Sequence, residues 1–522
     1  MTEQVRWPRI ARLLSRLVLS RATTFAIRGI ESLRVMVEVD VRAGLPSFSI
    51  VGLGDRAVRE ARERVRAAVQ NSGFEFPSRR VIVNLAPAYV RKVGAGFDLA
   101  IACGVLAASG QLPTETLAET AVLGELSLGG ELGPTRGALA IAEGAQRAGI
   151  VRLLVAPGNA HEAALVEGLE VVPAPDLRGV AAILRGEAAA GEFEPEIPRT
   201  AAACDVADLG DVRGHAGPVR ALVIAAAGGH NLLLSGPPGT GKTMLARRLP
   251  SILPAMTRAE AIEVTRIQSV AGVAPGGLAE RRPFRAPHHT ISPSGLVGGG
   301  PFPIPGEATM AHQGVLFLDE LSEFNRNALE ALRQPLEDRR VVVVRGQRVA
   351  VFPTRFVLVA ATNPCPCGYA GTPRCRCSEL DHSRHRRRLS GPLLDRVDLL
   401  VDVQRPSATD LAGSAVTSSD GARAEVEAAR ERQRVRLEGT GAGCNADMTP
   451  ALVRRYIPLD DAAAGLLRRA YERGGISARG HQRVLKVART IADLAGRDDV
   501  ALDDVRSALG WRLEESVDAL AA

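Results

Sequence analysis

A glycine-rich stretch near the middle of the 522-residue chain has the residue types that bind phosphate. It follows a run at residues 231–235 that is predicted to be a buried strand, and it precedes a helical pattern that starts at Met244. Glycines let backbone N–H groups approach phosphate oxygens, while a lysine and a hydroxyl residue reach the β/γ oxygens and Mg²⁺. The sequence predicts a site for ATP and Mg²⁺, with a glycine turn that binds no nucleotide as the alternative. The residues expected to contact nucleotide are Gly236, Pro237, Pro238, Gly239, Thr240, Gly241, Lys242, Thr243 and Met244.

Two adjacent carboxylates, Asp319 and Glu320, come directly after the apolar run Val315–Leu318. Such a pair at the end of a buried strand is costly without a cation nearby. We expect Asp319 to share the Mg²⁺ shell with the Thr243 hydroxyl, and Glu320 to orient and deprotonate the attacking water. A plain exposed strand end is the alternative.

Two further polar residues fit hydrolysis of a triphosphate. Asn363 follows a third apolar strand at residues 356–361, so its amide could contact the γ-phosphate and the attacking water. Arg396 lies too far along the chain to belong to the phosphate loop, and it is predicted to be an arginine finger for a neighbouring subunit. For Arg396 the alternative is a surface ion pair with Asp395 or Asp398.

The elements that must position these residues show a repeating pattern. Apolar strands at residues 211–403 are each followed by a polar or glycine-rich turn, which indicates a parallel sheet with its catalytic loops at the strand ends. Residues 272–306 contain 15 Gly or Pro, which predicts a long loop insertion. Residues 340–352 predict a β-hairpin that turns at residues 345–347. A Ser/Gly-rich hinge at residues 413–421 precedes a helical segment that runs to the end of the chain.

The first part of the chain is predicted to be a separate α/β or α+β domain. Strand patterns cover residues 33–41, Ser47–Val51 and residues 80–85. Helical patterns cover residues 57–71 and 99–108. The expected domains are an N-terminal extension (1–22), this first domain (23–191), a Pro/Glu-rich linker (192–210), a P-loop parallel-sheet domain (211–405) and a helical domain (406–522).

Composition narrows the class of protein and of partner. The net charge of +7 and pI of 9.3 favour an acidic partner such as nucleic acid, and 3% aromatic residues favour backbone-led, sequence-tolerant binding. Seven cysteines, four of them between residues 365 and 377, suit a reducing compartment, so a cytoplasmic location is expected. The chain has no run of 18 apolar residues, and no membrane partner is expected. The arginine-rich residues 1–21 could touch a membrane or DNA, with a frayed extension as the alternative.

Several longer strings carry a family resemblance. Over residues 22–512 the chain resembles the ComM/YifB family of magnesium-chelatase-like AAA+ ATPases. The resemblance implies a hexameric ring that binds single-stranded or branched DNA and drives branch migration when transforming DNA is integrated. It also implies a Lon-protease-like, S5-fold N-terminal domain, a P-loop AAA+ domain and a C-terminal helical lid, with Asn363 as the sensor residue. The strings are residues 44–52, 84–87, 225–231, 284–290, 314–320, 363–368, 390–396 and 488–494.

The resemblance also suggests roles for arginines outside the phosphate loop. Arg479, or as second choice Arg483, would be the sensor-2 residue that points at the γ-phosphate. A helix-surface pair at i,i+4 is the alternative. Arg285, Arg345 and Arg348 are candidates for contacts to the DNA backbone, with a solvated loop face as the alternative.

Two clusters have metal-binding residue types. His288 and His289 are adjacent on the Gly/Pro-rich loop, where a structural or polar role competes with metal binding. Four cysteines could hold one Zn²⁺ tetrahedrally, although their C-x-C spacing is tighter than the usual C-x₂-C. Four reduced, packed thiols are the alternative. These cysteines are Cys365, Cys367, Cys375 and Cys377.

The Lon-like resemblance raises a protease function, which the residues argue against. Gly96 stands where a serine nucleophile would lie, and residues 93–166 contain no lysine to act as base. Arg152 in that region stays charged and cannot be a base. The first domain is therefore expected to be inactive and to serve assembly or DNA docking. The alternatives to a DNA motor are the motor subunit of a metal chelatase and an ATP-dependent chaperone or protease.

Overall fold

The computed structural model describes residues 19–188, 207–273, 276–300, 303–345, 348–370, 372–388 and 391–512. The chain forms two compact units. One contains Met1–Ala201 and Thr265–Ala279, and the other contains Ala202–Val264 and Glu280–Ala522. Residues 1–18 and residues 192–206 of the expected linker lie outside the described residues.

The first unit contains a mixed seven-stranded sheet in the order β3-β4-β2-β1-β5-β8-β9. Its first half is built from antiparallel pairs of β1 with β2 and of β2 with β4, whereas β1, β5, β8 and β9 run parallel. A second, two-stranded sheet joins β6 and β7. The strands are β1 (Leu19–Arg28), β2 (Glu31–Arg42), β3 (Ser47–Val51), β4 (Arg80–Ala86), β5 (Thr120–Leu123), β6 (Glu125–Leu126), β7 (Leu132–Gly133), β8 (Arg152–Val155) and β9 (Glu170–Pro173).

In the first unit, helices with apolar residues on one side bury that side, and a helix that is apolar all round is buried completely. In α1 the buried residues recur at helical spacing, and the Asp55 side chain caps the helix by accepting from Val58 N at 2.9 Å. All residues of α2 are buried, because this helix is apolar on every side and lies in the core. The helices are α1 (Arg56–Asn71), α2 (Asp98–Ala108), α3 (Thr114–Glu119), α4 (Ala138–Arg147), α5 (Pro157–Ala163) and α6 (Leu177–Arg185).

The predicted elements of this unit are confirmed as β2, β3, β4, α1 and α2. The sheet also contains β1, which begins at Leu19 and so lies partly within the expected N-terminal extension. The mixed arrangement of its strands agrees with the α/β or α+β expectation.

The second unit contains a five-stranded parallel sheet in the order β11-β12-β15-β10-β16. Because all strands point the same way, their carboxyl ends lie at one edge, where loops can gather functional side chains. The strands are β10 (Leu232–Ser235), β11 (Phe284–Arg285), β12 (Val315–Leu318), β15 (Val357–Thr362) and β16 (Leu399–Asp402). The parallel sheet predicted for this segment is confirmed.

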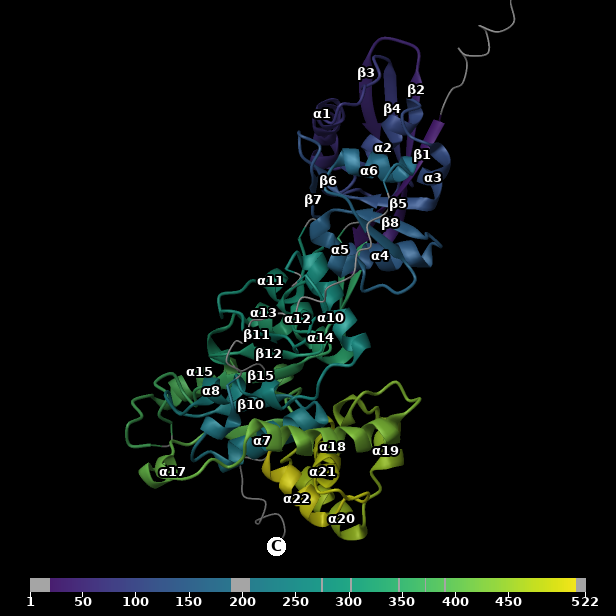
Figure 1. Ribbon diagram of the computed structural model, residues 1–522. Helices are drawn as coiled ribbons and strands as arrows, with labels where there is room; N and C mark the ends of the chain where they lie inside the picture. Colours follow the sequence, from purple (N-terminus) through teal and green to yellow (C-terminus); the bar gives the residue numbers. More distant parts are fainter. Residues whose placement is uncertain are drawn as a thin grey trace, which may run out of the picture. The chain divides into compact units, whose positions relative to one another are not determined.

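Successive residues of these strands face two different cores. Leu232 and Leu234 of β10 belong to a cluster with α7 and the helices of residues 419–510, whereas Leu233 belongs to a cluster with α11, α12 and α13. Helices therefore cover both faces of the sheet (Figure 1). The helices are α7 (Ala216–Gly228), α8 (Lys242–Ala246), α9 (Leu249–Ile252), α11 (Pro293–Val297), α12 (Glu307–Met310), α13 (Arg326–Ala331), α14 (Arg333–Asp338), α15 (Glu379–Arg388), α16 (Gly391–Leu394) and α17 (Ala408–Ala412). A further helix, α10 (Arg258–Ala271), belongs to the second unit up to Val264 and to the first from Thr265.

The long Gly/Pro-rich insertion is more ordered than predicted. Within residues 272–306 the chain forms β11, an edge strand of the sheet, and the short helix α11, which begins at Pro293 with Ser292 as its cap. Proline at the first helical position is compatible with a helix because its missing N–H would be unpaired there. The expectation of a loop throughout was therefore wrong for these two segments.

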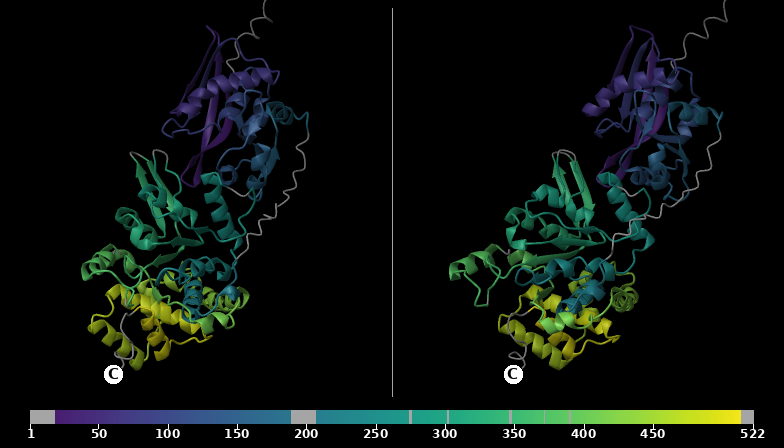
Figure 2. Two further views of the ribbon diagram at one scale, coloured as in Figure 1. Left: turned by 90° about the vertical axis from the view of Figure 1, so that its left-hand side faces the viewer. Right: turned by 60° about the vertical axis from the view of Figure 1, so that its left-hand side comes forward.

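The predicted β-hairpin is confirmed. Its strands, β13 (Arg340–Arg345) and β14 (Arg348–Pro353), are antiparallel, and Arg345 pairs with Arg348. The two strands project from the second unit in both views of Figure 2.

The C-terminal segment is helical, as predicted. Its helices pack in the same hydrophobic cluster as α7 and the parallel sheet. No helix of the described residues is long and apolar enough to cross a bilayer. The helices are α18 (Ser419–Leu437), α19 (Pro450–Tyr456), α20 (Asp461–Glu472), α21 (Ala478–Leu494) and α22 (Leu502–Gly510).

Candidate functional site

The phosphate loop connects β10 to α8, and its glycines stand where other residues would not fit. Gly239 and Gly241 have φ values of 75° and 89°, in the left-handed region that glycine adopts without strain. A Cβ atom on Gly236 would collide with the carbonyl oxygen of Val403. The loop therefore turns tightly between two neighbouring strand ends, and α8 begins at Lys242 rather than at the predicted Met244.

Lys242 is held inside this loop by oxygen atoms. It is 9% exposed, and its Nζ donates to the carbonyl oxygens of Gly236 at 2.6 Å and Pro237 at 2.8 Å. A third bond goes to Asn363 Oδ1 at 3.1 Å. Burial lowers the pKa of the ammonium group, while the nearby Asp319 carboxylate opposes this. A buried ammonium among mostly neutral oxygens attracts further negative charge, which phosphate supplies.

Thr243 and Asp319 lie next to each other although they are far apart in the sequence. Thr243 Oγ1 donates to Asp319 Oδ2 at 2.7 Å, and Asp319 Oδ1 accepts from the N–H of Glu320 at 3.0 Å. A hydroxyl and a carboxylate are the hard oxygen ligands that Mg²⁺ prefers when it also binds phosphates. These two residues therefore fit the magnesium role predicted for them.

Glu320 lies just beyond Asp319 in an unusual backbone conformation. Its φ is 51°, a left-handed value that costs a non-glycine residue free energy, and its side chain is 59% exposed. Its Oε2 lies 3.6 Å from Nδ1 of His289. The carboxylate is thus accessible to solvent beside the Thr243–Asp319 pair, as a base that activates water must be.

Asn363 follows β15 and joins the site from the neighbouring strand. Its Oδ1 accepts from Lys242, and its backbone carbonyl oxygen lies 2.8 Å from His385 Nε2. Because β15 lies between β12 and β10 in the sheet, the three strand ends bring Lys242, Asp319 and Asn363 to one edge.

Arg396 and Arg479 meet at a shared carboxylate. Arg396 is 2% exposed, and its guanidinium forms an ion pair with Glu337 of α14. Arg479 Nη2 lies 3.5 Å from the same Glu337 oxygen, and its side chain is 57% exposed. Burial lowers the pKa of the Arg396 guanidinium, with Glu337 raising it and Arg479 lowering it further. The pairs proposed as alternatives for Arg396, with Asp395 or Asp398, are not the ion pair that the structure gives it.

The second-choice residue, Arg483, has a structural partner. It forms an ion pair with the buried Asp398, which also accepts from the N–H of Asn231 at 2.9 Å. Burial disfavours the charged form of Asp398, but Arg483 and His230 outweigh it and hold the pKa of this carboxyl well below its usual value. Arg483 therefore ties α21 to the start of β16, and the first choice for a sensor residue stays Arg479.

Of the three arginines suggested for DNA contacts, one is neutralised within the chain. Arg285 donates to both oxygens of Glu307, at 2.6 and 2.7 Å, and this contact raises the pKa of its guanidinium. The structure therefore does not support Arg285 as a phosphate contact. Arg345 is exposed at the end of β13, and the Arg348 side chain lies outside the described residues.

The two predicted metal clusters have different outcomes. The four cysteine Sγ atoms all lie within 4.8 Å of one another, and this is the metal-type cluster found in the described part of the chain. His288 does not join such a cluster: its Nδ1 lies 2.9 Å from Thr290 Oγ1, and its ring lies 4.0 Å from that of His289. A metal site at the two histidines is not supported.

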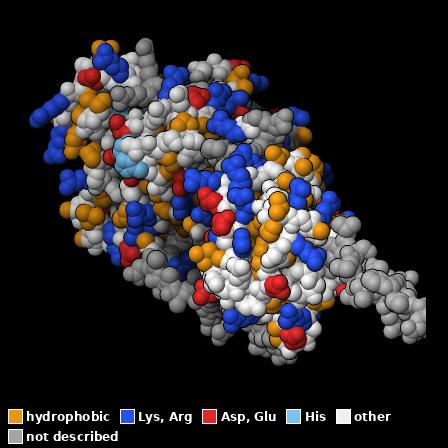
Figure 3. Space-filling view, turned by 90° about the horizontal axis from the view of Figure 1, so that it is seen from above, with side chains coloured by type: hydrophobic (Ala, Val, Ile, Leu, Met, Phe, Trp, Pro, Cys, Tyr) orange, Lys and Arg blue, Asp and Glu red, His pale blue; other side chains and the backbone are white. Residues whose placement is uncertain are grey.

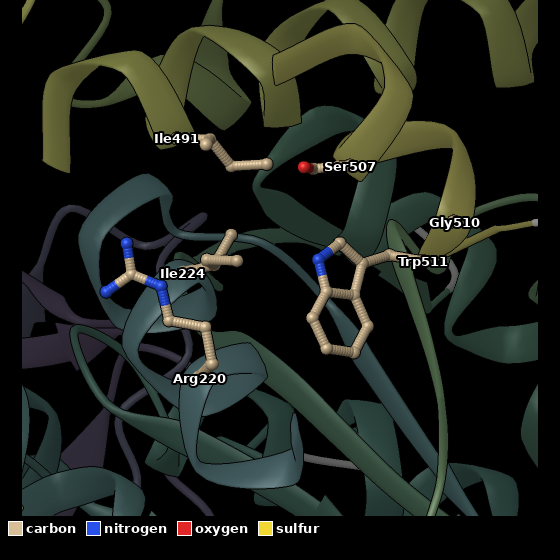
Figure 4. Close-up of a pocket in the computed structure, with 6 residues that line it drawn as sticks. All are labelled: Arg220, Ile224, Ile491, Ser507, Gly510 and Trp511. Atoms are coloured by element: carbon tan, nitrogen blue, oxygen red, sulfur yellow. The ribbon is translucent and has the colours of Figure 1, made fainter. Parts of the chain in front are cut away.

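A pocket of about 370 Å³ lies apart from these residues. Its lining comes from α7 and the C-terminal helices, as Figure 4 shows: Arg220, Ile224, Ile491, Ser507, Gly510 and Trp511. None of the predicted site residues lines it.

Two side chains near the site, Glu337 and His385, were not found from the sequence, and His289 was considered only as a metal ligand. Each of the three contacts a predicted residue that is distant along the chain, respectively Arg396, Asn363 and Glu320. His289 follows β11, His385 lies on α15 after β15, and Glu337 lies on α14. The sequence contains these polar residues but does not show which strand ends and helices are neighbours.

Comparison with protein families gives three matches along the chain. Residues 208–411 match the family described as "Magnesium chelatase, subunit ChlI". Residues 37–159 match "Subunit ChlI of Mg-chelatase", and residues 416–512 match "Magnesium chelatase, subunit ChlI C-terminal".

Similar proteins match over nearly the whole length. An uncharacterized protein of Mycobacterium tuberculosis is 44% identical over 95% of this chain and 99% of its own. The competence protein ComM of Haemophilus influenzae is 42% identical over 95% of this chain and 97% of its own. The uncharacterized protein YifB of Escherichia coli is 41% identical over the same shares. With this identity over nearly the whole length of both proteins and a P-loop on a parallel sheet, the chain belongs to the ComM/YifB family of magnesium-chelatase-like AAA+ ATPases.

Proposed function

We propose that this chain is an ATP-driven motor that remodels DNA as a hexameric ring and promotes branch migration during homologous recombination or natural transformation. The ATPase part rests on one observation, the gathering of Lys242, Thr243, Asp319 and Glu320 at one edge of the parallel sheet. The DNA part rests on the likeness to a relative that is named a competence protein.

In the proposed hydrolysis, each residue has one task. Lys242 would leave its carbonyl partners for the β/γ-phosphate oxygens. Thr243 and Asp319 would hold Mg²⁺, which would supply neutralisation of the charge on the phosphates. Glu320 accepts a proton from the attacking water because it is the exposed carboxylate next to that pair. Asn363 orients the water or the γ-phosphate while its Oδ1 lies within reach of Lys242.

Assembly would complete the site with arginines. Arg396 would act on the nucleotide of a neighbouring subunit, and Arg479 on the nucleotide of its own chain. Both arginines lie beside Glu337. This carboxylate would balance their positive charge until the phosphates of a bound nucleotide compete with it for the guanidinium groups. The proposed arrangement places a helical lid, α18 to α22, over the P-loop domain.

DNA would be bound through its backbone. Arg345 is exposed on the projecting hairpin, and the net charge of +7 favours a polyanion. Lys and Arg side chains are dispersed over the face seen in Figure 3, with acidic and hydrophobic side chains between them. Positive charges dispersed in this way favour many weak contacts to phosphates, which carry no sequence information, rather than a single surface that recognises bases.

The first unit is proposed to be a Lon-protease-like domain without protease activity. Its lysine in the relevant motif, Lys92, is buried, and its Nζ donates to the carbonyl oxygens of Leu85 at 2.6 Å and Pro87 at 2.5 Å. Burial lowers the pKa of this ammonium group, but Gly96 supplies no nucleophile for it to activate. Assembly or DNA docking in the cytoplasm is the role that we assign to this unit.

The family matches favour one second candidate, the motor of a metal chelatase. The test is ATP turnover of the purified chain with single-stranded DNA, forked DNA, a chelatase partner or unfolded protein, together with a three-way branch-migration assay. We expect forked or single-stranded DNA to stimulate turnover, and Lys242→Ala to abolish both activities. Stimulation by the chelatase partner alone would replace the DNA proposal, and stimulation by unfolded protein alone would indicate a chaperone.

A further inference from the structure

We propose that Cys365, Cys367, Cys375 and Cys377 bind one zinc ion, and that this ion fixes the loop after β15 against the phosphate loop. The metal site itself is independent of the proposed function, whereas its effect on ATP turnover rests on that function. Each part is argued from distances and burial of these side chains.

The four sulfur atoms have the spacing of a tetrahedral thiolate site. With Zn–S bonds of about 2.3 Å, tetrahedral geometry separates the sulfurs by about 3.8 Å. The observed Sγ–Sγ distances are 3.3 Å for Cys365–Cys367, 3.9 Å for Cys365–Cys375 and 3.7 Å for Cys367–Cys375. Cys377 completes the set within 4.8 Å. One ion at their centre would reach all four thiolates with little movement.

Disulfide bonds do not account for this cluster. A disulfide requires an S–S separation of about 2.05 Å, and all four cysteines are free. Cys365, Cys367 and Cys375 each have two neighbouring sulfur atoms. Disulfide bonds would require only one neighbouring sulfur for each cysteine.

Packing of neutral thiols in a core does not account for it either. Cys365 is fully buried, but it is not a member of any of the three hydrophobic clusters, and the other three cysteines are partly exposed. Residues 363–378 contain no helix or strand among their described residues. A segment of this length without regular structure or a core of its own needs another source of order, and a metal ion supplies it.

The surroundings fit a charged metal site. Four thiolates with one Zn²⁺ carry a net negative charge, and Arg374 and Arg376 alternate with the cysteines in the sequence. His382 Nε2 lies 3.5 Å from Cys375 Sγ, where its ring can donate a hydrogen bond to the sulfur of a metal ligand.

The cysteine loop also contacts the nucleotide site. A Cβ atom on Gly368 would lie 2.6 Å from Pro238 Cδ, so the loop packs closely on the phosphate loop. Cys365 is two residues beyond Asn363, whose carbonyl oxygen lies 2.8 Å from His385 Nε2 on the helix after the cluster. We therefore assign the ion a positioning role: it fixes both ends of the segment that places Asn363 beside Lys242.

The first test is the metal content of the untagged full chain, expressed with zinc and measured by elemental analysis. We expect about one zinc per chain in the wild type and less than about a tenth in Cys375→Ser/Cys377→Ser. The matched control is Cys103→Ala/Cys444→Ala, which removes two buried thiols outside the cluster and should retain the zinc. Wild-type protein with four reduced cluster thiols and no bound zinc would overturn the proposal.

A second measurement does not depend on the folding of a variant. Cobalt added to chelator-treated wild-type protein should give the intense thiolate-to-metal charge-transfer band and visible bands of tetrahedral coordination by four sulfurs. A spectrum of octahedral cobalt without the charge-transfer band would contradict a thiolate site. Retention of the tetrahedral spectrum in His382→Ala supports four cysteine ligands, and its loss would show that the histidine is a ligand in place of one cysteine.

The positioning role has its own readout. Removal of the ion should lower kcat for ATP at least tenfold while the Kd for ATP changes less than about threefold, because Asn363 is displaced but the phosphate loop keeps its residues. Equal kcat with and without zinc would overturn the positioning role. A chain that binds zinc but never hydrolyses ATP would instead refute the proposed function, so the two failures are distinguishable.

Discussion

Single residues at the edge of the parallel sheet hold one another in the positions where nucleotide is proposed to bind. Lys242 is bonded to carbonyl oxygens of its own loop and to Asn363, and Thr243 to Asp319. These contacts pre-organise the side chains, because each is oriented by a partner before phosphate and Mg²⁺ arrive. Substitutions should therefore separate binding from hydrolysis.

Lys242→Ala should weaken nucleotide binding. The variant loses the ammonium that faces the phosphates, so we expect at least a tenfold rise in the Kd of a fluorescent ATP analogue measured by titration. Lys486→Ala is the matched control, since Lys486 is a partly buried lysine of the same unit and donates to Ala446 O at 2.9 Å. An unchanged Kd in Lys242→Ala would contradict the assignment of the phosphate loop.

Glu320→Gln should bind ATP and fail to hydrolyse it. An amide keeps the shape of the side chain but cannot accept the proton of water, so kcat should fall at least about 100-fold with little change in the Kd for ATP. Glu323→Gln makes the same change one turn away and should keep kcat within about twofold. Normal turnover by Glu320→Gln would show that another group is the base.

At the scale of secondary-structure elements, an ion pair joins helices α1 and α2 of the first unit. Arg64 of α1 donates to both carboxylate oxygens of Asp98, the first residue of α2, at 2.7 and 3.1 Å. Burial raises the pKa of Asp98 to about 6, although Arg64 favours the charged form. The contact joins two helices, and the free energy needed to keep Asp98 charged in this buried position makes the stability of the fold depend on pH.

The sign of this dependence is testable. Because the pKa of Asp98 is higher in the folded than in the unfolded chain, its contribution to the free energy of unfolding falls as pH rises from about 4 to about 6, by about 2–3 kcal/mol. Calorimetry at pH 5 and pH 7.5 should show that Asp98→Asn gains stability relative to wild type at the higher pH. A relative loss at pH 7.5 would mean that Arg64 outweighs burial.

The sequence predicts a strand or helix well where its apolar residues are the buried ones. It predicts less well where apolar residues are exposed and polar residues are buried. The bounds of β12 follow from its four apolar residues, which are followed directly by Asp319. In β1, by contrast, Leu19 is 50% exposed while Ser20 is buried and donates to Gly104 O at 2.6 Å. Its pattern of apolar residues therefore did not reveal the strand.

Site residues follow the same distinction. Lys242, Asp319 and Asn363 could be found because each follows an apolar strand in a recognisable motif. Glu337 could not be found, and His289 was considered only as a metal ligand. Their contacts with Arg396 and Glu320 arise only in the folded chain. The burial of Arg396 was likewise not visible in the sequence, since its partner Glu337 lies 59 residues earlier in the chain.

At the scale of the whole molecule, the proposed ring requires residues of two subunits at each ATP site. Arg396 is buried against Glu337 in the single chain, so its action on a neighbour requires that ion pair to open. The exposed Arg479 already lies at the same carboxylate and can replace Arg396 there. Assembly and hydrolysis would then be coupled through one acidic side chain.

Mixing two inactive variants tests this arrangement. Lys242→Ala and Arg396→Ala should each lack ATP turnover as homogeneous assemblies, yet their mixture should regain activity, because some interfaces then combine an intact phosphate loop with an intact arginine. Turnover is measured after subunit exchange. Lys242→Ala mixed with Glu320→Gln is the control that should stay inactive, since both changes affect the same chain's site. No recovery in the first mixture would place Arg396 in its own subunit's site.

The alternation of β10, with Leu232 and Leu234 in one core and Leu233 in the other, restricts where this chain can change in length. Insertion or deletion of a single residue inside such a strand would exchange its two sets of side chains and misfit both cores together. Additions placed after the carboxyl end of a strand leave both sets in place. New segments can therefore accumulate beside the catalytic edge, as the cysteine loop after β15 does, without disturbing the frame that holds the reactive groups.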